Sequence, residues 1–438
     1  MASRLSILVS FIVCGLIAGC DSSNSVEPEE RVSDTELADL ITFNGQRRLQ
    51  NFTLPESDDF ASIPQDSRNP LSAPKVELGK LLFHEPALSA NTRHPEALGT
   101  YACATCHHSG AGFQAGRQQS MGDGGSGWGQ NGEGRRPSVT YPPEDVDTPG
   151  LKSPTVLNSA FQKVMLWSGG AGANGPNAGT DAVWDEFGGA GANHYGYDGL
   201  ESQAIVALTV HRMFEPVAAD HLINDNPTYR SLWDVVFPGE PISDKNIGLA
   251  IAAYERTILA NRAPFQRWMK GENGAMTEAQ KRGALVFFGE AGCSSCHTGP
   301  ALSSMAFYAL GMPDMPQEIS MGRGEFLGEE NSEFKFKVPQ LYNLADSPFL
   351  GHGGAFFSVQ EVVEYYNEGI PDRSLPAGRV SDQFHPLSLT DQEVRDLAEF
   401  VSGGLRDPEL DRYVPTSVPS GGCVPANDAR ARADLGCQ

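Results

Sequence analysis

The chain has 438 residues, of which 40% are hydrophobic and 20% charged, and its formal net charge at pH 7 is −23. This much negative charge excludes a partner that is bound by general electrostatic attraction to phosphate groups, so nucleic acid and anionic membrane surfaces are ruled out. A basic electron-transfer protein would instead be attracted to the chain.

The first twenty residues predict an export signal. A single charge at Arg4 precedes an apolar run, Ile7–Ile17, which is too short for a permanent membrane helix. The run leads into Ile17–Cys20, which resembles the bacterial lipobox and implies lipid attachment to Cys20. We therefore expect a signal peptide over 1–19 and a periplasmic protein that a lipid anchors to a bacterial membrane.

Two pentapeptides of the pattern Cys-x-x-Cys-His, Cys103–His107 and Cys293–His297, stand out from the rest of the chain. In this pattern two thiols attach covalently to a haem and the adjacent imidazole binds its iron. Structural zinc sites also use Cys-x-x-Cys pairs, but they seldom place His directly after the second Cys. Because such haem attachment occurs outside the cytoplasm, the motifs agree with the export signal. We predict two covalently bound haem c groups, with attachment through Cys103, Cys106, Cys293 and Cys296 and with His107 and His297 as iron ligands.

Helices are expected before both motifs. Leu78–Phe83 precedes the first motif, and before the second Thr277 and Gln280 form a capping-box pattern that opens a helix ending at Gly289. Between them, Ile247–Trp268 has apolar residues at helical spacing and predicts one long packed helix. Strand signals are scarce, so the predicted fold class is mainly α: two c-type cytochrome domains with long ordered loops.

Two Gly-rich segments, 122–134 and 169–191, predict the longest loops. We expect them to be ordered rather than of low complexity because large aromatic side chains within them can dock: Trp128, Trp184 and Phe187.

The length of the chain exceeds what one core usually holds, and a polar linker near residue 272 divides it between the motifs. The acidic and polar segment that follows the signal peptide is interpreted as a tether. The last two cysteines predict a disulfide in an oxidising compartment, with two free thiols as the alternative. The expected parts are a tether over 20–47, haem domains over 48–272 and 273–415, and a tail over 416–438 that contains Cys423 and Cys437.

Several blocks in one order resemble the bacterial dihaem cytochrome c peroxidase family, which includes MauG. The resemblance runs from about residue 76 to 405. It implies that hydrogen peroxide reacts at the N-terminal haem and that the C-terminal haem relays electrons, with Trp167 between them. Besides the two haem motifs, the blocks are Leu78–Phe83, Ser153–Phe161 with Trp167, Ala252–Thr257 and His352–Phe356.

In classical members of that family, a His from the loop after the first motif binds the iron of the first haem and occupies the position where peroxide would bind. This chain has Ser120–Asp123 in that place, and a carboxylate is a poor ligand for haem iron. The resemblance therefore implies an open first iron, as in MauG. The alternative is that another imidazole fills the vacancy, from His94, His108 or His211.

Peroxide cleavage needs a group that moves a proton between the two oxygens. The resemblance points to Gln203 and, with a register that is off by two residues, to Glu215 as catalytic residues. His211 is the alternative to Glu215 in the acid-base role.

The second iron needs a sixth ligand, and the resemblance places Tyr366 there. Adjacent helical residues differ by about 100°, so only one of Tyr365 and Tyr366 can face the haem. A phenolate ligand would stabilise oxidised iron. The alternative is a thioether from Met305, Met312, Met315 or Met321.

The resemblance also implies a calcium ion between the haems, held partly by an Asn side chain. This chain has Lys152 in that block, and an ammonium group cannot bind calcium. Calcium is therefore possible but doubtful.

The leading hypothesis is a dihaem oxidoreductase of the peroxidase class. Its electrons would come from a small cytochrome or cupredoxin, or, as in MauG, from side chains of a partner protein substrate. The alternative is a lipid-anchored dihaem electron-transfer cytochrome without catalysis, which requires six ligands on both irons.

Overall fold

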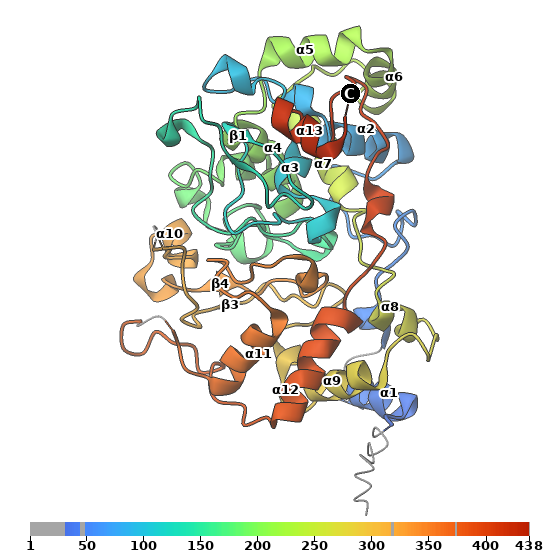
Figure 1. Ribbon diagram of the computed structural model, residues 1–438, viewed down its shortest axis with the longest axis vertical. Helices are drawn as coiled ribbons and strands as arrows, with labels where there is room; N and C mark the ends of the chain where they lie inside the picture. Colours follow the sequence, from blue (N-terminus) through green and yellow to red (C-terminus); the bar gives the residue numbers. More distant parts are fainter. Residues whose placement is uncertain (1–30, 44–48, 317–318, 373–374, 438) are drawn as a thin grey trace, which may run out of the picture. The chain divides into compact units, whose positions relative to one another are not determined.

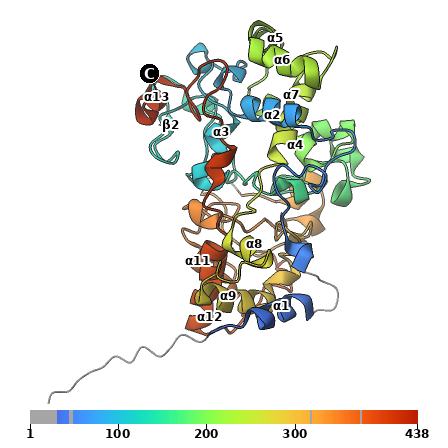
Figure 2. The same cartoon turned by 90° about the vertical axis from the view of Figure 1, so that its right-hand side faces the viewer.

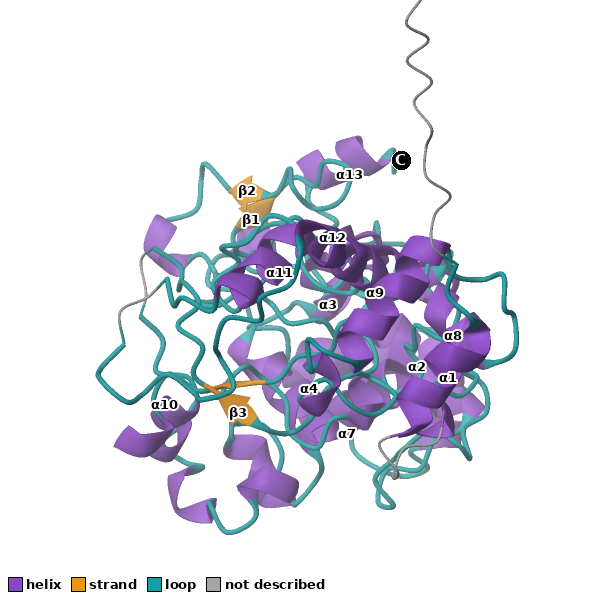
Figure 3. Cartoon of the chain, turned by 90° about the horizontal axis from the view of Figure 1, so that it is seen from below, coloured by secondary structure: helices purple, strands orange, loops and turns teal. Residues whose placement is uncertain are grey.

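The computed structural model describes residues 31–43, 49–316, 319–372 and 375–437. Helices joined by long loops make up most of this part, and the mainly α fold class is confirmed (Figure 3). Two short antiparallel strand pairs complete it, β1 (Gly125–Ser126) with β2 (Arg136–Pro137) and β3 (Phe307–Tyr308) with β4 (Phe336–Lys337). The helices are α1 Asp34–Phe43, α2 Ala73–Phe83, α3 Cys103–Cys106, α4 Gly199–Val210, α5 Pro216–Asp225, α6 Pro227–Val236, α7 Asp244–Glu255, α8 Pro264–Met269, α9 Glu278–Phe288, α10 Arg323–Leu327, α11 Val359–Glu368, α12 Asp391–Glu399 and α13 Ala429–Leu435.

The helix before each haem motif crosses a second helix at a glycine. A Cβ on Gly79 of α2 would lie 1.8 Å from the Ala250 carbonyl oxygen of α7, and one on Gly283 of α9 would lie 1.9 Å from that of Asp396 in α12. Only glycine permits such a close approach of two backbones. These two crossings position the chain that leads into each motif (Figure 2).

The start of α9 confirms the predicted capping box. Thr277 Oγ1 accepts from the Gln280 backbone N–H, and Gln280 Oε1 accepts in return from the Thr277 N–H at 3.1 Å. Gly289 follows the last helical residue, as expected. Satisfying these N–H groups stabilises the first turn of the helix.

The prediction of one helix over Ile247–Trp268 is wrong. The helix α7 ends at Glu255, and α8 begins only at Pro264, which stands at the first helical position. The intervening backbone is bound by Asn158, whose N–H donates to the Ile258 carbonyl and whose Oδ1 accepts from the Ala260 N–H, both at 2.9 Å. Apolar spacing continues through this break because its side chains are buried too, so periodicity alone did not reveal it.

The predicted tether over 20–47 is wrong for residues 34–43, which form α1. This helix packs against α9, and its Leu37 and Ile41 are buried in the core (Figure 1). Asp34 accepts from Lys281 Nζ at 2.7 Å and from Trp268 Nε1 at 2.8 Å. The predicted signal peptide and Cys20 lie outside the described residues.

The C-terminal tail lies against the first haem motif. Cys423 and Cys437 form a disulfide with their Cα atoms 6.0 Å apart. Thr105, inside the first motif, donates from Oγ1 to the Pro425 carbonyl at 2.5 Å, and Tyr101 pairs with Ala426. Residues 32–438 form one compact unit, and a domain boundary near residue 272 remains a prediction.

Both Gly-rich loops are docked by their aromatic side chains, as predicted. Trp128 is buried against Ala426 and Ala431 of the tail. Trp184 is buried beside Phe326 of α10, and the Phe187 ring lies 5.3 Å from that of Phe326. In the described part of the chain, no helix has the length and apolar character that a membrane crossing requires.

Candidate functional site

The first haem motif lines a cavity of about 50 Å³ between α3, α4 and α7. Cys103, Cys106 and His107 form one side of it, and neither thiol takes part in a disulfide. Burial lowers the pKa of His107 to about 4, with a further contribution from the charge of nearby His211. Its imidazole is therefore neutral, which is the form that binds a metal.

His211 reaches the same cavity from the end of α4. Its Nδ1 donates to Asp147 Oδ2 at 3.0 Å. Burial opposes protonation of the ring, but the Asp147 carboxylate outweighs it and raises the pKa of His211. Because the carboxylate holds Nδ1, the other ring nitrogen is available to a ligand in the cavity.

The other two candidate histidines do not line this cavity. His94 bonds to Asp145 through Nε2 at 2.7 Å, and the His108 ring packs against Trp128 with 4.8 Å between centroids. Of the three imidazoles considered for the first iron, only His211 lines the cavity of the first motif.

Asp123 is turned away from the cavity. Its Oδ2 accepts from Arg212 Nη1 and from the Arg93 N–H, both at 2.9 Å, and Tyr141 donates to its Oδ1 at 2.5 Å. The Asp123 carboxylate is fully buried, and these three hydrogen bonds satisfy both of its oxygens. From its loop, Ser120 and Gly122 line the cavity instead.

Gln203 lines the first cavity, whereas Glu215 does not. The Gln203 Oε1 atom is buried and meets no hydrogen-bond partner within the described residues. The Glu215 carboxylate caps α5, accepting from the Ala218 N–H at 2.7 Å. The prediction of Glu215 as a catalytic residue is therefore corrected: Pro216 starts a new helix there, and the helix uses the carboxylate as its N-cap.

Sequence reasoning gave no role to Glu255, which ends α7 in this cavity. Its Oε2 is buried without a hydrogen-bond partner in the described part of the chain. Burial, followed by the negative charge of Glu201, raises the pKa of Glu255 to about 8. Its position directly after the apolar stretch 247–254 was the available signal. The unpaired oxygens of Gln203 and Glu255 fit a cavity that is completed by a polar ligand.

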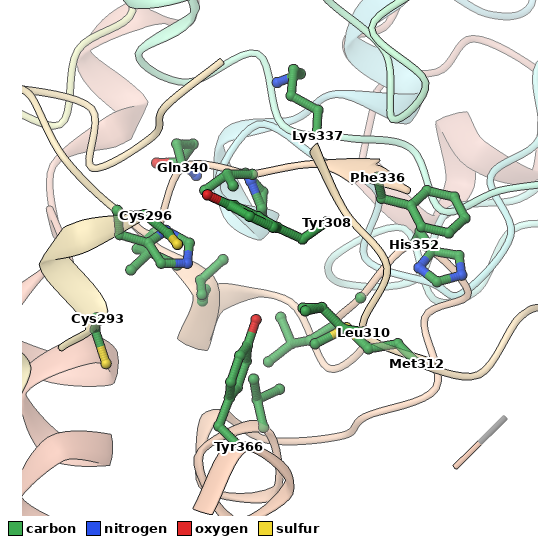
Figure 4. A pocket seen from close by; sticks show the side chains of 18 of the residues that line it. Cys293, Cys296, Tyr308, Leu310, Met312, Phe336, Lys337, Gln340, His352 and Tyr366 are labelled. Atoms are coloured by element: carbon green, nitrogen blue, oxygen red, sulfur yellow. The ribbon is translucent and has the colours of Figure 1, made fainter. Parts of the chain in front are cut away.

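The second haem motif lines a larger cavity of about 280 Å³ (Figure 4). His297 Nδ1 donates to the Leu302 carbonyl at 3.0 Å, which leaves Nε2 for a metal. Tyr366 of α11 points its hydroxyl into this cavity, whereas Tyr365 donates its own to the Leu310 carbonyl at 2.7 Å outside it. One tyrosine therefore faces the motif and the other packs away from it.

Among the four candidate methionines, only Met312 lines the second cavity. It belongs to the loop that leads from β3 toward α10 and lies on the same side of the cavity as Leu310 in Figure 4. Of the side chains that the sequence offered as the sixth ligand, Tyr366 and Met312 are therefore the two that line this cavity.

Trp167 joins the two cavities through the segment 152–154. The indole lines the second cavity, and its Nε1 donates to the Lys152 carbonyl at 2.7 Å. Within that segment, Ser153 lines the first cavity while Lys152 and Pro154 line the second. Trp167 thus contacts the stretch of chain that separates the two sites.

The residues at the expected calcium position do not fit that ion. Lys152 Nζ is buried there and donates to the Ala115 carbonyl at 2.5 Å. Within the described residues, no group of three or more His, Cys, Asp and Glu side chains could hold a metal ion. The ammonium group of Lys152 thus belongs to the block of residues where the resemblance implied a bound calcium ion.

Comparisons with known proteins show which proteins this chain resembles. Residues 73–274 match the family described as di-haem cytochrome c peroxidase. Methylamine utilization protein MauG of Methylorubrum extorquens is 28% identical over 90% of this chain and 92% of its own length, and cytochrome-c peroxidase IdrP1 of Denitromonas iodatirespirans is 27% identical over 77% and 83%.

Among solved structures, a MauG-like protein associated with microbial copper homeostasis superposes with a TM-score of 0.59 at 23% identity. The match covers 82% of this chain and 96% of that one, which supports the fold. Together with the paired haem motifs, these matches show that the chain is similar to the dihaem cytochrome c peroxidase and MauG family, and they support a haem-containing oxidoreductase of the peroxidase type.

Proposed function

We propose that the chain reduces hydrogen peroxide at the first cavity. A haem attached through Cys103 and Cys106, with His107 on its iron, would supply the metal that binds peroxide and accepts its oxidising equivalents. The observation that carries the proposal is the His211–Asp147 pair in the same cavity as His107. The Asp123 side chain does not compete for the space, because it is held by Arg212 and Tyr141.

His211 is the acid-base residue in this proposal. Its free ring nitrogen takes a proton from the inner oxygen of peroxide and returns it to the outer oxygen, which leaves as water. Asp147 fixes the tautomer of His211 and stabilises its charged form. Gln203 orients the peroxide, and Glu255, protonated at neutral pH, holds a further proton at the cavity wall.

The second cavity passes electrons between an external donor and the first site. A haem attached through Cys293 and Cys296 would be held by His297 and Tyr366. A basic small cytochrome or a cupredoxin fits the strongly acidic chain as donor. A partner protein whose side chains are oxidised is the other donor class, and the phenolate ligand favours it because it stabilises oxidised iron.

Two matched variants test which side chain binds the second iron. Tyr366→Phe should change the ferric absorption and spin state of the second haem, because it removes the only hydroxyl that faces the cavity from α11. Tyr365→Phe removes a hydroxyl that bonds Leu310 and should leave the spectrum unchanged. A sulfur-to-iron absorption band in the unaltered protein would instead assign the position to Met312.

Trp167 is proposed to carry electrons between the haems. Trp167→Phe should slow inter-haem transfer by about tenfold, which corresponds to about 1.4 kcal/mol in activation free energy. Trp184→Phe is the control, since Trp184 is buried in a loop outside both cavities. Flash photolysis of the half-reduced protein measures the rate, and equal rates for Trp167→Phe and the unaltered protein would refute the bridge.

Mixing the fully oxidised protein with peroxide tests the proposed function as a whole. If the first iron is open, peroxide is consumed at once and the absorption spectrum changes within the mixing time. A reaction that begins only after one-electron reduction would show that the first iron is closed at rest. No reaction in either state would exclude the peroxidase function.

One observation also favours electron transfer without catalysis. A carboxylate-bound imidazole is a common arrangement for a metal ligand, so the His211–Asp147 pair suits a sixth ligand as well as a proton carrier. The ferric spin state separates the two functions. A population of high-spin haem supports the peroxidase, whereas entirely low-spin haem supports the electron-transfer cytochrome.

We further propose that the mature protein is periplasmic and carries a lipid on Cys20, which the sequence pattern alone supports. Intact mass measurement of the mature chain checks both the cleavage after residue 19 and the lipid. Two thioether-linked haems would add to the same mass, so the measurement also tests covalent attachment.

A further inference from the structure

Two buried lysines lie at the second cavity without a negatively charged partner. Lys152 is 1% exposed and Lys337 is 7% exposed, and both line the cavity. Their ammonium groups bond only to neutral oxygens, Lys152 to the Ala115 carbonyl and Lys337 to the Gln162 side-chain amide. Across the described residues, no Asp or Glu oxygen lies within 4.0 Å of either ammonium.

A buried ammonium group without a negatively charged partner lowers the stability of a folded protein. A buried ammonium without an anion loses its hydration and gains no Coulombic attraction in return. Burial accordingly lowers the pKa of Lys152 to about 7 and that of Lys337 to about 8. Three other buried cations are paired with carboxylates, Arg135 with Asp428, Arg256 with Glu201 and Lys281 with Asp34, whereas Arg323 is held by backbone carbonyls. The two lysines therefore lack the anions that buried charges ordinarily have.

Both lysines are bound to the backbone around Trp167. The Lys337 N–H donates to the Trp167 carbonyl at 2.9 Å, and the Trp167 indole donates to the Lys152 carbonyl at 2.7 Å. The polar side chains of Gln114, Gln162 and Gln340 line the cavity with them. Elsewhere the wall is apolar, with Phe287, Leu310, Val338 and Val363 among its side chains. Both lysines thus belong to the lining of a cavity whose wall also has a large apolar part.

We propose that Lys152 and Lys337 bind the two propionate carboxylates of the haem held at Cys293, Cys296 and His297. A porphyrin with two carboxylates on one edge matches a cavity that has a mostly apolar wall and two lysines among its polar lining residues. The carboxylates supply the missing anions, and the lysines replace a metal ion as the positive charge beside Trp167. The proposal rests on a haem in this cavity and not on the peroxide reaction.

The midpoint potential of the second haem tests this, measured by spectroelectrochemical titration of the two-haem protein without peroxide. Lys337→Met and Lys152→Met each remove a positive charge beside the haem, which disfavours reduction. Each should shift the reduction equilibrium at least tenfold toward the oxidised form, equivalent to about 59 mV for one electron. Lys337→Arg and Lys152→Arg retain the charge and should stay within threefold of the unaltered protein.

Lys163→Met is the matched control, because Lys163 is 58% exposed, pairs with Asp198 and lines neither cavity. Shifts in both cavity Met variants no larger than in this control would overturn the proposal. Haem content is measured in parallel. Loss of the second haem from a Met variant but not from its Arg counterpart supports the proposal, whereas loss from both shows a packing role and contradicts it.

Discussion

Replacing His211 by Gln should lower kcat/KM for peroxide by about 10² to 10⁴-fold, the range that a positioned acid-base group contributes. The amide cannot carry the proton between the peroxide oxygens, although it can still occupy the space beside Asp147. Haem content and the ferric spectrum of the second haem should be unchanged, because His211 does not line the second cavity. Stopped-flow peroxide consumption measures the effect.

The control is His94→Gln, which also removes an imidazole paired with an aspartate, at 2.7 Å from Asp145, but outside the cavity. It should change kcat/KM by less than threefold. If His211 is instead an iron ligand, His211→Gln converts low-spin haem to high-spin haem and increases the reaction with peroxide. An increase in rate would therefore contradict the acid-base role and support the electron-transfer alternative.

Replacing Arg256 by Met should destabilise the two-haem protein by about 3 to 5 kcal/mol, the usual cost of leaving one partner of a buried ion pair alone. Arg256 binds Glu201 through two nitrogens, at 2.8 and 2.5 Å, and both side chains are almost fully buried. Without it, the Glu201 carboxylate is left unpaired near Glu255, whose pKa its charge already raises. Denaturant unfolding followed by tryptophan fluorescence measures the loss.

Arg262→Met is the matched control for the ion pair. Arg262 pairs with Glu409 at the surface, with about half of each side chain exposed, and its loss should cost less than about 1 kcal/mol. Removing both charges in Arg256→Met with Glu201→Leu should recover part of the stability, because no buried charge then remains unpaired. A loss below about 1 kcal/mol for Arg256→Met would show that water reaches Glu201.

The sequence by itself determined the features that depend on neighbouring residues. The haem motifs could be read because the porphyrin dictates the spacing of Cys103, Cys106 and His107, whatever fold surrounds them. The cap of α9 could be read for the same reason, since Thr277 and Gln280 satisfy each other within one turn. The helical fold class followed from such local patterns.

Elements that depend on distant contacts were misread. The acidic start was interpreted as a tether, but Leu37 and Ile41 find a partner in α9, more than 230 residues later in the chain. The break between α7 and α8 arises because Asn158 binds their connection. Neither partner is visible within a window of neighbouring residues, so composition and periodicity could not reveal either outcome.

Only the tertiary structure decided which side chains face each cavity. Glu215 and Glu255 are both carboxylates near the ends of helices, yet one caps α5 and the other enters the first cavity because α7 packs on α4. The sequence likewise could not show that packing buries Lys152 and Lys337 without anions. Burial and pairing are properties of long-range packing, and they set the charge and reactivity of each group. The sequence therefore predicted where the haems attach, and the tertiary structure decided which residues line the cavities at those positions.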